Sequence, residues 1–354
     1  MMQEPLFTTI VHAYNRPALL KQSVEALQRQ TYSNLEIILI NNGGIPEVVE
    51  YLHEIALADS RIKLIHFSEN QFSWDDPVKF IPVCWNAALA EATGEYVWIQ
   101  QDDDMLADDY IEKMAALFQG NPECTTAAGL AVGFDLDGNI LDTEPRTKNF
   151  RPRYMAGHEL VLGMVRGDQS LFGAPGTIFA IRRDVLVEAG GYQRSIEQSQ
   201  LYGIVPFGIT GFDETAILYW RRHEGQINLM LSARGWVGIK EVWSCLKECE
   251  IEHRWQIFGA DVAKEVVSHF TEIECRRAAQ WFIRNLAARK FSGAWRILAL
   301  IWYRPQFWPI VLRRAPRELI IGVAWRLLKL MIRRGFKVFS AFGKIMPGPF
   351  KGSS

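Results

Sequence analysis

The sequence contains few cysteines and no long hydrophobic run. Its five cysteines, an odd number, are Cys84, Cys124, Cys245, Cys249 and Cys275. They lack the paired spacing of a zinc site, and this usage favours a reducing, cytosolic setting over a disulfide-stabilised secreted one. No charge-free stretch approaches the roughly 18 apolar residues that a membrane-spanning helix needs. The first residues lack the basic segment of a secretory signal, so we expect neither a spanning nor an exported segment.

Acidic residues are nearly absent from the C-terminal part of the chain. From Arg276 onward there are 17 lysines and arginines and one acid, Glu318, although the net charge of all 354 residues is −1. The preceding residues are therefore acidic on balance. This asymmetry predicts two regions with different partners, and the length suits one large domain with an appendage, or two domains.

Strand-like and helix-like segments alternate along the first hundred residues. Apolar runs predict strands at 7–13, 35–40, 62–67 and 96–100. Helical spacing predicts helices beginning near Pro17, where Asn15 could cap the first turn, and over 46–58 and 83–92. Alternation of this kind predicts an α/β fold with a mostly parallel sheet and helices on both faces.

Three consecutive carboxylates end the last of these strands. Asp102, Asp103 and Asp104 repel one another, and this costs stability unless a cation or a metal-bound polyphosphate is expected there. Open α/β sheets bind ligands just outside the carboxyl ends of their strands, where this triplet falls. The alternative is a solvated acidic loop before the next helix, whose first turn Asp108 and Asp109 would cap.

Beyond the triplet, the pattern predicts a helix at 110–118, a hairpin of 124–134 with 139–142, and a helix at 185–189 that Gly190 ends. The long loop 68–82, which carries Trp74, is typical of a binding loop. The segment 212–220 is predicted to be a helix headed by Asp213 and Glu214. These acids could simply favour the helix N-terminus, or one could act as a general base toward an attacking hydroxyl.

In order along the chain, several of these motifs resemble those of family 2 glycosyltransferases with the GT-A fold. The resemblance covers about residues 5–225 and rests on Tyr14-Asn15-Arg16-Pro17, Gln30-Thr31-Tyr32, Asn41-Asn42-Gly43, Trp85-Asn86-Ala87-Ala88, Asp102-Asp103-Asp104, Gly190-Gly191-Tyr192 and Asp213-Glu214. It implies a GT-A catalytic domain, a nucleotide-sugar donor, an inverting reaction and a Mg²⁺ or Mn²⁺ cofactor.

The resemblance also implies roles for single residues. Donor binding would fall to Ala13, Tyr14, Asn15, Arg16, Asn41, Gln101 and Asp102. The family's D-x-D motif aligns on Gln101-Asp102-Asp103, so Asp103, with Asp102, would hold the metal and Gln101 would face the ribose. The catalytic base would be Glu214 or Asp213.

Three positions depart from the family pattern. Asn41 and Gln101 stand where the family commonly has aspartate, so they keep hydrogen-bonding capacity but lose charge. The late acidic pair reads Asp213-Glu214 instead of Glu-Asp. The identity of the catalytic base is therefore open, with a preference for Glu214. One alternative is therefore a non-catalytic sugar-nucleotide-binding or scaffold protein. The other is a nucleotidyltransferase, although the turn at 12–17 lacks a glycine-rich phosphate loop.

The basic region 276–344 is helix-like and rich in aromatic residues. Within it, residues 318–333 are predicted to form an amphipathic helix with a narrow cationic face and a wide apolar one. Such a helix suits an anionic membrane surface. The alternative is a C-terminal helical bundle that packs on the catalytic domain or in a dimer, whereas the many large apolar residues argue against nucleic acid.

These observations predict three parts: a catalytic domain over 1–225, an acceptor-side connecting segment over 226–275, and a membrane-associating region over 276–354. The expected reaction is transfer of a sugar to a hydroxyl of a glycan precursor, lipid-linked, in surface polysaccharide synthesis. We expect the protein to be cytoplasmic and peripheral on the inner face of the cell membrane. His253 and Trp74 are the expected acceptor-side residues.

Overall fold

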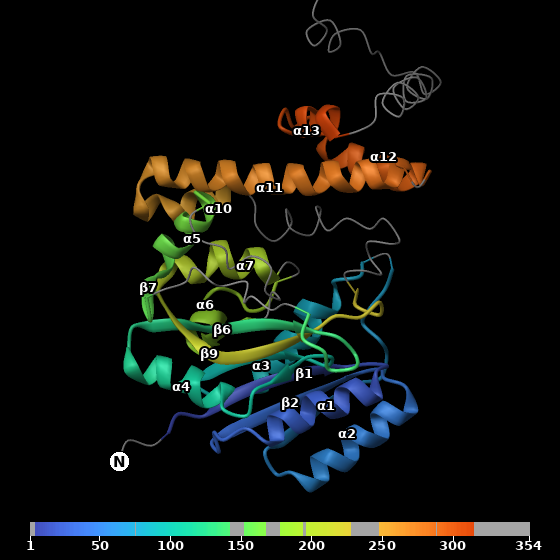
Figure 1. Cartoon of the computed structure of the whole chain (residues 1–354), viewed down its shortest axis with the longest axis vertical. Coiled ribbons are helices and arrows are strands. Elements are labelled where there is room, and N and C mark those ends of the chain that lie inside the picture. Colours follow the sequence, from blue (N-terminus) through green and yellow to red (C-terminus); the bar gives the residue numbers. More distant parts are fainter. Residues whose placement is uncertain are drawn as a thin grey trace, which may run out of the picture. The chain divides into compact units, whose positions relative to one another are not determined.

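The computed structural model describes residues 4–74, 76–141, 152–167, 178–193, 196–227, 248–287 and 289–314 (Figure 1). These residues fall into two compact units, of which the larger ends at Thr271 and the smaller begins at Glu272. The long helix α11 (Ala260–Ala287) contains this boundary. The three-part division at residues 225 and 275 stays a prediction.

The first half of the central sheet is parallel. Its strands are β1 (Phe7–Ala13), β2 (Leu35–Asn42), β3 (Ile62–Phe67) and β4 (Tyr96–Gln101), in the order β3-β2-β1-β4. In β2 every residue is buried, as its almost continuous apolar run predicts for a strand covered on both faces. The four predicted strands are confirmed.

The helices of this half lie against the sheet. They are α1 (Pro17–Gln28), α2 (Pro46–Ala58) and α3 (Asn86–Glu91), which a one-turn π-helix η1 (Ile81–Trp85) precedes. Pro17 occupies the first turn of α1, as expected, and Leu20, Val24 and Leu27 are buried. The capping role expected for Asn15 is wrong, because Arg16 is the N-cap residue and no side chain caps this helix.

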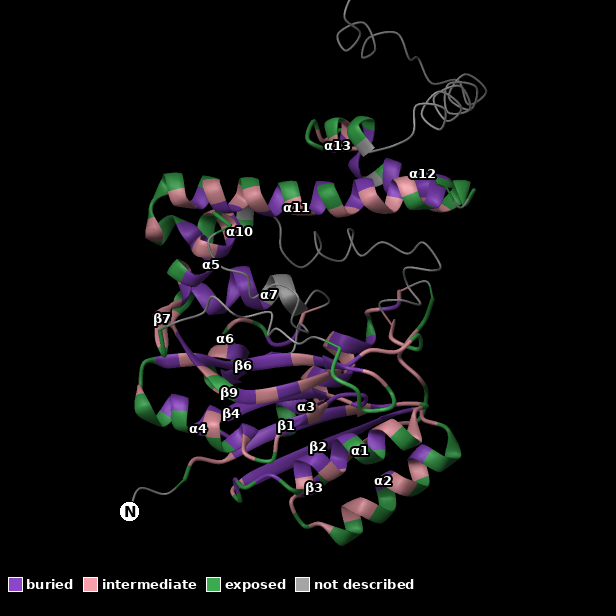
Figure 2. Ribbon diagram, in the orientation of Figure 1, coloured by how far each residue is buried: buried purple, intermediate pink, exposed green. Residues whose placement is uncertain are grey.

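The second half of the sheet is mixed. It continues from β4 through β8 (Phe179–Arg182), β6 (Cys124–Phe134), β9 (Ile209–Arg221) and β5 (Met105–Leu106), and β7 (Tyr154–Ala156) also pairs with β9. Strands β6 and β9 are parallel, whereas the other pairs here are antiparallel. Figure 2 shows that both halves form one buried layer. The sheet as a whole is mixed, with its parallel part at the N-terminal half.

The remaining elements of the larger unit surround this layer. They are α4 (Tyr110–Gly120), α5 (Gly157–Val165), α6 (Arg183–Glu188), α7 (Ile196–Gly203), η2 (Val205–Phe207), α10 (Glu248–Trp255) and η3 (Gln256–Phe258). Gly190 ends α6 with a φ of 88°, the left-handed conformation expected there. The predicted second hairpin arm is reduced to one bridge, Phe134 with Ile140.

The helix predicted at 212–220 is wrong, because these residues belong to β9. The segment is rich in β-branched and aromatic residues, which favour strands. It also pairs with β6 and β5, so sheet contacts outweigh the local pattern of two acids before apolar residues. Asp213 and Glu214 therefore do not head a helix.

The described part of the smaller unit consists of the end of α11, α12 (Phe291–Ile301) and α13 (Phe307–Arg314). Phe282 and Phe307 pack edge to face with ring centroids 5.6 Å apart. No described helix combines the length and the apolar character that crossing a membrane requires. The amphipathic helix predicted at 318–333 lies outside the described residues.

Glu36 is a buried carboxylate in β2 that ties three segments of the parallel half together. It accepts hydrogen bonds from Thr8 Oγ1 (2.6 Å), Lys63 Nζ (2.5 Å) and both the amide and hydroxyl of Thr93 (2.9 and 2.8 Å). Burial alone would raise its pKa, but the hydrogen bonds from Lys63, Thr8 and Thr93 outweigh burial and lower the pKa to about 2. The ionised form therefore stabilises the fold.

Glu36→Gln is expected to lower the free energy of unfolding by about 2 kcal/mol at pH 7. Because the folded-state pKa is depressed, this contribution is complete above the unfolded pKa of 4.5 and is lost as the pH falls toward 2. Urea unfolding of both proteins between pH 7 and pH 3.5 measures the difference. The exposed Glu54→Gln is the control, and an equal deficit at every pH would contradict the charge-based explanation.

Candidate active site

Polar side chains from three segments of the chain meet at the carboxyl edge of the sheet. The triplet Asp102, Asp103 and Asp104 directly follows β4, and all three are buried. Arg16 comes from the turn after β1, and His223 follows the end of β9. The carboxyl ends of parallel strands meet at one edge, so residues more than 200 positions apart become neighbours.

The centre of this edge is an arginine between two carboxylates. Arg16 Nη2 donates to Asp102 Oδ1 at 2.7 Å, and Arg16 Nη1 donates to Asp103 Oδ2. His223 Nε2 lies 3.1 Å from the same Asp103 oxygen and 3.4 Å from Arg16 Nη1. The guanidinium group thus pairs with both nearest carboxyl groups, and this offsets part of the cost of burying them.

Burial and this pairing move the three carboxyl pKa values in different directions. Burial raises the pKa of Asp102 to about 7, although Arg16 opposes the shift. For Asp103, burial is outweighed by the hydrogen bond from His223 and by the charge of Arg16, so its pKa falls. Burial and the charge of Asp103 raise the pKa of Asp104. Asp103 is therefore the carboxylate that this environment keeps ionised.

His12, at the end of β1, adds no charge here. Burial and the neighbouring Arg16 cation lower the pKa of His12 to about 3, so its ring stays neutral at physiological pH. The ring packs against Phe80 with centroids 4.8 Å apart. The cation that forms ion pairs with both Asp102 and Asp103 is Arg16.

Arg221, the last residue of β9, holds the triplet in place. Its amide donates to Asp104 Oδ1 at 2.9 Å, and its Nε donates to the Asp103 carbonyl at 2.7 Å. Its Nη2 donates to Gln22 Oε1 at 2.7 Å, and the guanidinium lies 4.4 Å from the ring centroid of Phe134. These contacts join α1, β6 and β9 to the backbone of the triplet, so its carboxylates are positioned by a rigid frame.

The predicted donor-binding residues lie along the same edge. Ala13 ends β1, Tyr14 and Asn15 follow it, and Asn41 and Gln101 are near or at the ends of β2 and β4. Asn41 is buried, and its Oδ1 accepts from Gly44 N at 2.8 Å while its Nδ2 lies 2.7 Å from His66 Nδ1. The structure brings these residues together with Asp102 and Asp103, and their binding roles stay predictions.

Asp213 and Glu214 lie in the middle of β9, in the bulge between Phe212, which pairs with Ala128, and Ile217, which pairs with Leu130. Arg221 pairs with Phe134, so this bulge lies about 15 Å from the carboxyl end of β9 at the rise of a strand. Asp213 Oδ1 accepts from the amide and hydroxyl of Thr215, at 2.9 and 2.7 Å, within a β-bulge. The structure therefore does not bring the predicted base to the triplet.

The two predicted acceptor-side residues are placed differently. Trp74 lies in the loop after β3, beyond the same carboxyl edge, and packs edge to face on Phe72 with centroids 5.0 Å apart. His253 is an exposed residue of α10. The described contacts of α10 lead to α7 through Trp255, whose Nε1 donates to the Tyr202 carbonyl, and not to the triplet.

The residues at the edge have the donor types that Mg²⁺ or Mn²⁺ requires. Asp102 and Asp103 offer carboxylate oxygens and His223 offers an imidazole nitrogen, which suit these ions. In the described part of the chain, no group of three or more His, Cys, Asp or Glu side chains is already arranged to hold a metal. Arg16 lies between the carboxylates, so a cation would have to displace its guanidinium.

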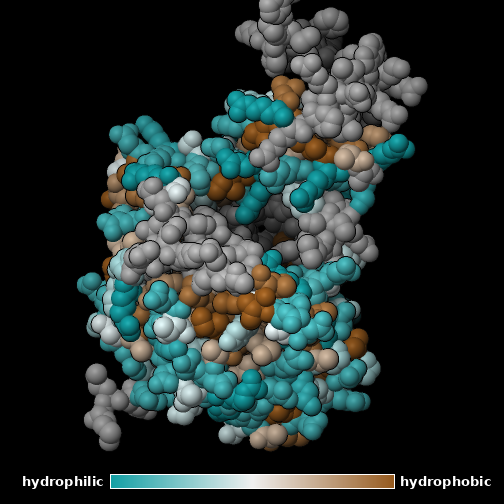
Figure 3. Space-filling model, in the orientation of Figure 1, coloured by the Kyte–Doolittle hydropathy of each residue, from teal (hydrophilic) through white to brown (hydrophobic). Residues whose placement is uncertain are grey.

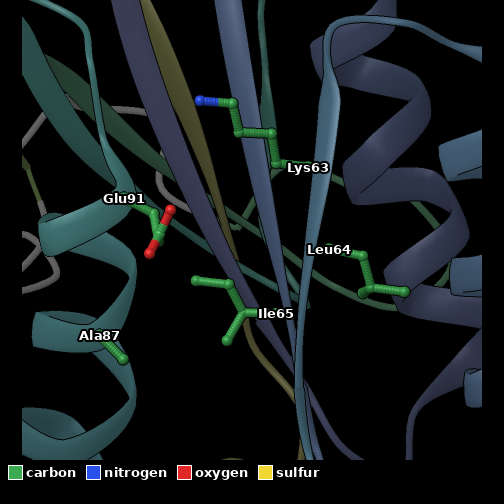
Figure 4. Close-up of a pocket in the computed structure, with 5 residues that line it drawn as sticks. All are labelled: Lys63, Leu64, Ile65, Ala87 and Glu91. Atoms are coloured by element: carbon green, nitrogen blue, oxygen red, sulfur yellow. The ribbon is translucent and has the colours of Figure 1, made fainter.

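A pocket of about 330 Å³ lies elsewhere, between the edge strand β3 and helix α3. Figure 4 shows Ile65 of β3 and Glu91 of α3 pointing toward each other across it. Strands β2 and β1 separate β3 from β4. The chemistry of the triplet is therefore not associated with this pocket.

Sequence reasoning missed Arg221 and His223. The signal was the basic run Arg221-Arg222-His223 directly after an aromatic segment. The prediction of a helix at 212–220 concealed the meaning of this basic run. Only a strand that ends at residue 221 places these side chains at the carboxyl edge.

Comparisons with known proteins agree with this fold. Residues 8–190, just over half of the chain, match the model of the family described as Glycosyl transferase family 2. An uncharacterized glycosyltransferase of Haemophilus influenzae is 31% identical over 138 residues, which are 39% of this chain and 52% of that protein. The putative glycosyltransferase EpsH of Bacillus subtilis is 28% identical over 167 residues, 47% of this chain and 46% of that protein. The chain thus covers about half the length of these relatives.

Two solved structures have a similar fold. Staphylococcus aureus TarS 1–349 in complex with UDP-GlcNAc has a TM-score of 0.53 and 14% identity, over 89% of this chain and 82% of that one. The mannosyltransferase PcManGT of Pyrobaculum calidifontis, in complex with GDP-Man and Mn²⁺, has a TM-score of 0.51 and 15% identity, over 92% and 88%. The predicted GT-A-like fold is confirmed, and with the family match over residues 8–190 it follows that the chain belongs to glycosyl transferase family 2.

Proposed function

We propose that this protein transfers a sugar from a nucleotide-sugar donor to a hydroxyl group of a glycan precursor. The observation that carries the proposal is the pair Asp102 and Asp103 at the carboxyl end of β4, facing Arg16 and His223. Family membership supports it, as do the UDP-GlcNAc and GDP-Man named for the two solved structures of similar fold.

The donor would lie along the carboxyl edge. Ala13, Tyr14, Asn15 and Asn41 would contact the base, and Gln101 would face the ribose. Asn41 is held by Gly44 and His66, so its amide is positioned before a ligand arrives. An amide both donates and accepts hydrogen bonds, which suits the polar edge of a nucleobase.

The diphosphate leaving group needs positive charge in the transition state. Asp103 and Asp102 would hold a Mg²⁺ or Mn²⁺ ion, with His223 beside them, and this ion supplies Lewis-acid stabilisation of the developing charge. Arg16, once released from the carboxylates, would pair with the phosphates, because a guanidinium binds phosphate oxygens in a bidentate manner. Arg221 would keep the carboxylates oriented.

The general base and the stereochemical outcome are inferred from the family resemblance. The assignment of Asp213 or Glu214 stays a prediction, but a base must lie within hydrogen-bond reach of the acceptor hydroxyl. Their position in the middle of β9, about 15 Å along the strand from Arg221, argues against both. Inversion rests on the family resemblance alone.

The acceptor is proposed to be a lipid-linked precursor of a surface polysaccharide, at the cytoplasmic face of the cell membrane. The excess of cations from Arg276 onward supports this setting, because anionic headgroups attract basic segments.

A donor screen tests the proposal. Hydrolysis of UDP-, GDP- and dTDP-sugars by the purified protein is followed with Mn²⁺ and with EDTA. We expect metal-dependent cleavage of one donor. Binding of a sugar nucleotide without any turnover would favour the scaffold alternative, and pyrophosphate release from a nucleoside triphosphate and a sugar phosphate would favour the nucleotidyltransferase.

A further inference from the structure

Helix α12 is apolar on two different faces. Its buried face includes Ala294, Ile297 and Ile301. Phe291, Trp295 and Trp302 are nevertheless exposed. At about 100° per residue these three positions fall within about 40° of one another around the helix. They form a second apolar stripe on the exposed side of α12.

The turn and helix after α12 extend this stripe. Tyr303 follows Trp302, and Leu312 lies in α13. We call Phe291, Trp295, Trp302, Tyr303 and Leu312 the α12–α13 aromatic surface; their exposed fractions range from 41% to 60%. Figure 3 shows hydrophobic residues at the surface in this part of the molecule, next to strongly hydrophilic ones. The position of Trp302 is fixed in part by Trp308, whose Nε1 donates to the Trp302 carbonyl at 2.8 Å.

The hydrophilic residues beside this surface carry charge of one sign. Residues 289–314 contain six arginines and lysines and no acid. Arg289, Lys290, Arg296 and Arg313 are exposed. Trp and Tyr prefer the boundary between apolar and aqueous phases, and cations flank such residues at anionic membranes. An apolar protein partner would not require this uniform charge.

We propose that the α12–α13 aromatic surface docks on an anionic lipid bilayer, with its aromatic rings in the interfacial region and its cations at the headgroups. This extends the proposed membrane setting by naming the surface, and it assigns the contact to described helices upstream of residues 318–333. It rests on the proposed function only for the location of the acceptor. Lipid binding is measured without donor or acceptor, so its test is separate from a test of sugar transfer.

Vesicle sedimentation with the full chain tests this proposal. Vesicles of phosphatidylcholine alone are compared with vesicles that contain one quarter phosphatidylglycerol. The unchanged protein should bind the anionic vesicles at least about tenfold more strongly. Trp295→Ala with Trp302→Ala should reduce that binding about tenfold or more, and Arg296→Glu with Arg313→Glu should abolish the preference for phosphatidylglycerol.

The matched control replaces two exposed apolar residues of the larger unit, Leu57→Ala with Val187→Ala, which should leave vesicle binding unchanged. Circular dichroism and the melting temperature verify folding of each variant, and donor hydrolysis reports separately on the proposed reaction. Unchanged binding by the double tryptophan variant would overturn the proposal. A second result would also overturn it: the unchanged protein is a dimer, and the double tryptophan variant is a monomer that still binds vesicles. The surface would then join two copies of the chain.

Discussion

Asp103→Asn is expected to lower sugar transfer about 100-fold or more, with little change in fold. Asparagine has nearly the same shape, so it can still occupy the space beside Arg16 and His223. It removes the charge of the carboxylate that the site keeps ionised, and therefore weakens the hold on a divalent cation. Initial rates with saturating donor and Mn²⁺ measure the loss, and direct Mn²⁺ binding should weaken in parallel.

Asp108→Asn is the matched control, because Asp108 is an exposed acid a few residues later whose ion pair with Arg29 is long, at 3.5 Å. It should keep nearly full activity. If Asp103→Asn retained more than about a third of the rate, the triplet would not be the reaction centre. If it lost activity but bound Mn²⁺ normally, Asp103 would act on the donor and not through the metal.

Arg16→Gln is expected to have two opposite effects that depend on the metal. Without a cation, the fold should lose about 2 kcal/mol, because Asp102 and Asp103 would be left buried without their guanidinium partner. With Mn²⁺, the variant should bind the ion about tenfold more tightly than the unchanged protein, since no guanidinium competes for the carboxylates. Melting temperatures in EDTA and in Mn²⁺, and Mn²⁺ titration followed by electron paramagnetic resonance, measure both effects.

Arg29→Gln provides the control, because it removes an exposed arginine near the same helix. It should change neither the melting temperature nor Mn²⁺ affinity. Equal or weaker Mn²⁺ binding by Arg16→Gln would mean that Arg16 helps to form the metal site, and the competition described above would be wrong.

Local patterns were sufficient for the parallel half of the sheet. Strands at Phe7–Ala13 and Ile62–Phe67 and the helix at Pro46–Ala58 have the predicted bounds. Buried parallel strands read as continuous apolar runs, and proline marks the first turn of both α1 and α2. The position of Asp102 and Asp103 at a ligand-binding edge followed from the same alternation.

Local patterns failed where long-range pairing decided the conformation. Residues 212–220 have acids ahead of apolar residues, which is typical of a helix start. They nevertheless form part of β9, because they pair with neighbouring strands on both sides. This difference moved Asp213 and Glu214 away from the triplet. It also delivered Arg221 and His223, more than 110 residues after Asp103, to the carboxyl edge of the sheet.

By itself, the sequence determined the fold class, the family resemblance, the acidic triplet and the basic C-terminal region. Those features depend on residue type and on spacing within a few turns or strands. Only the tertiary structure decided that Arg16 lies between Asp102 and Asp103, that Arg221 holds the triplet, and that α12 exposes a second apolar stripe. Each of these depends on which distant segments share a sheet edge or a helix face, and spacing along the chain does not specify that.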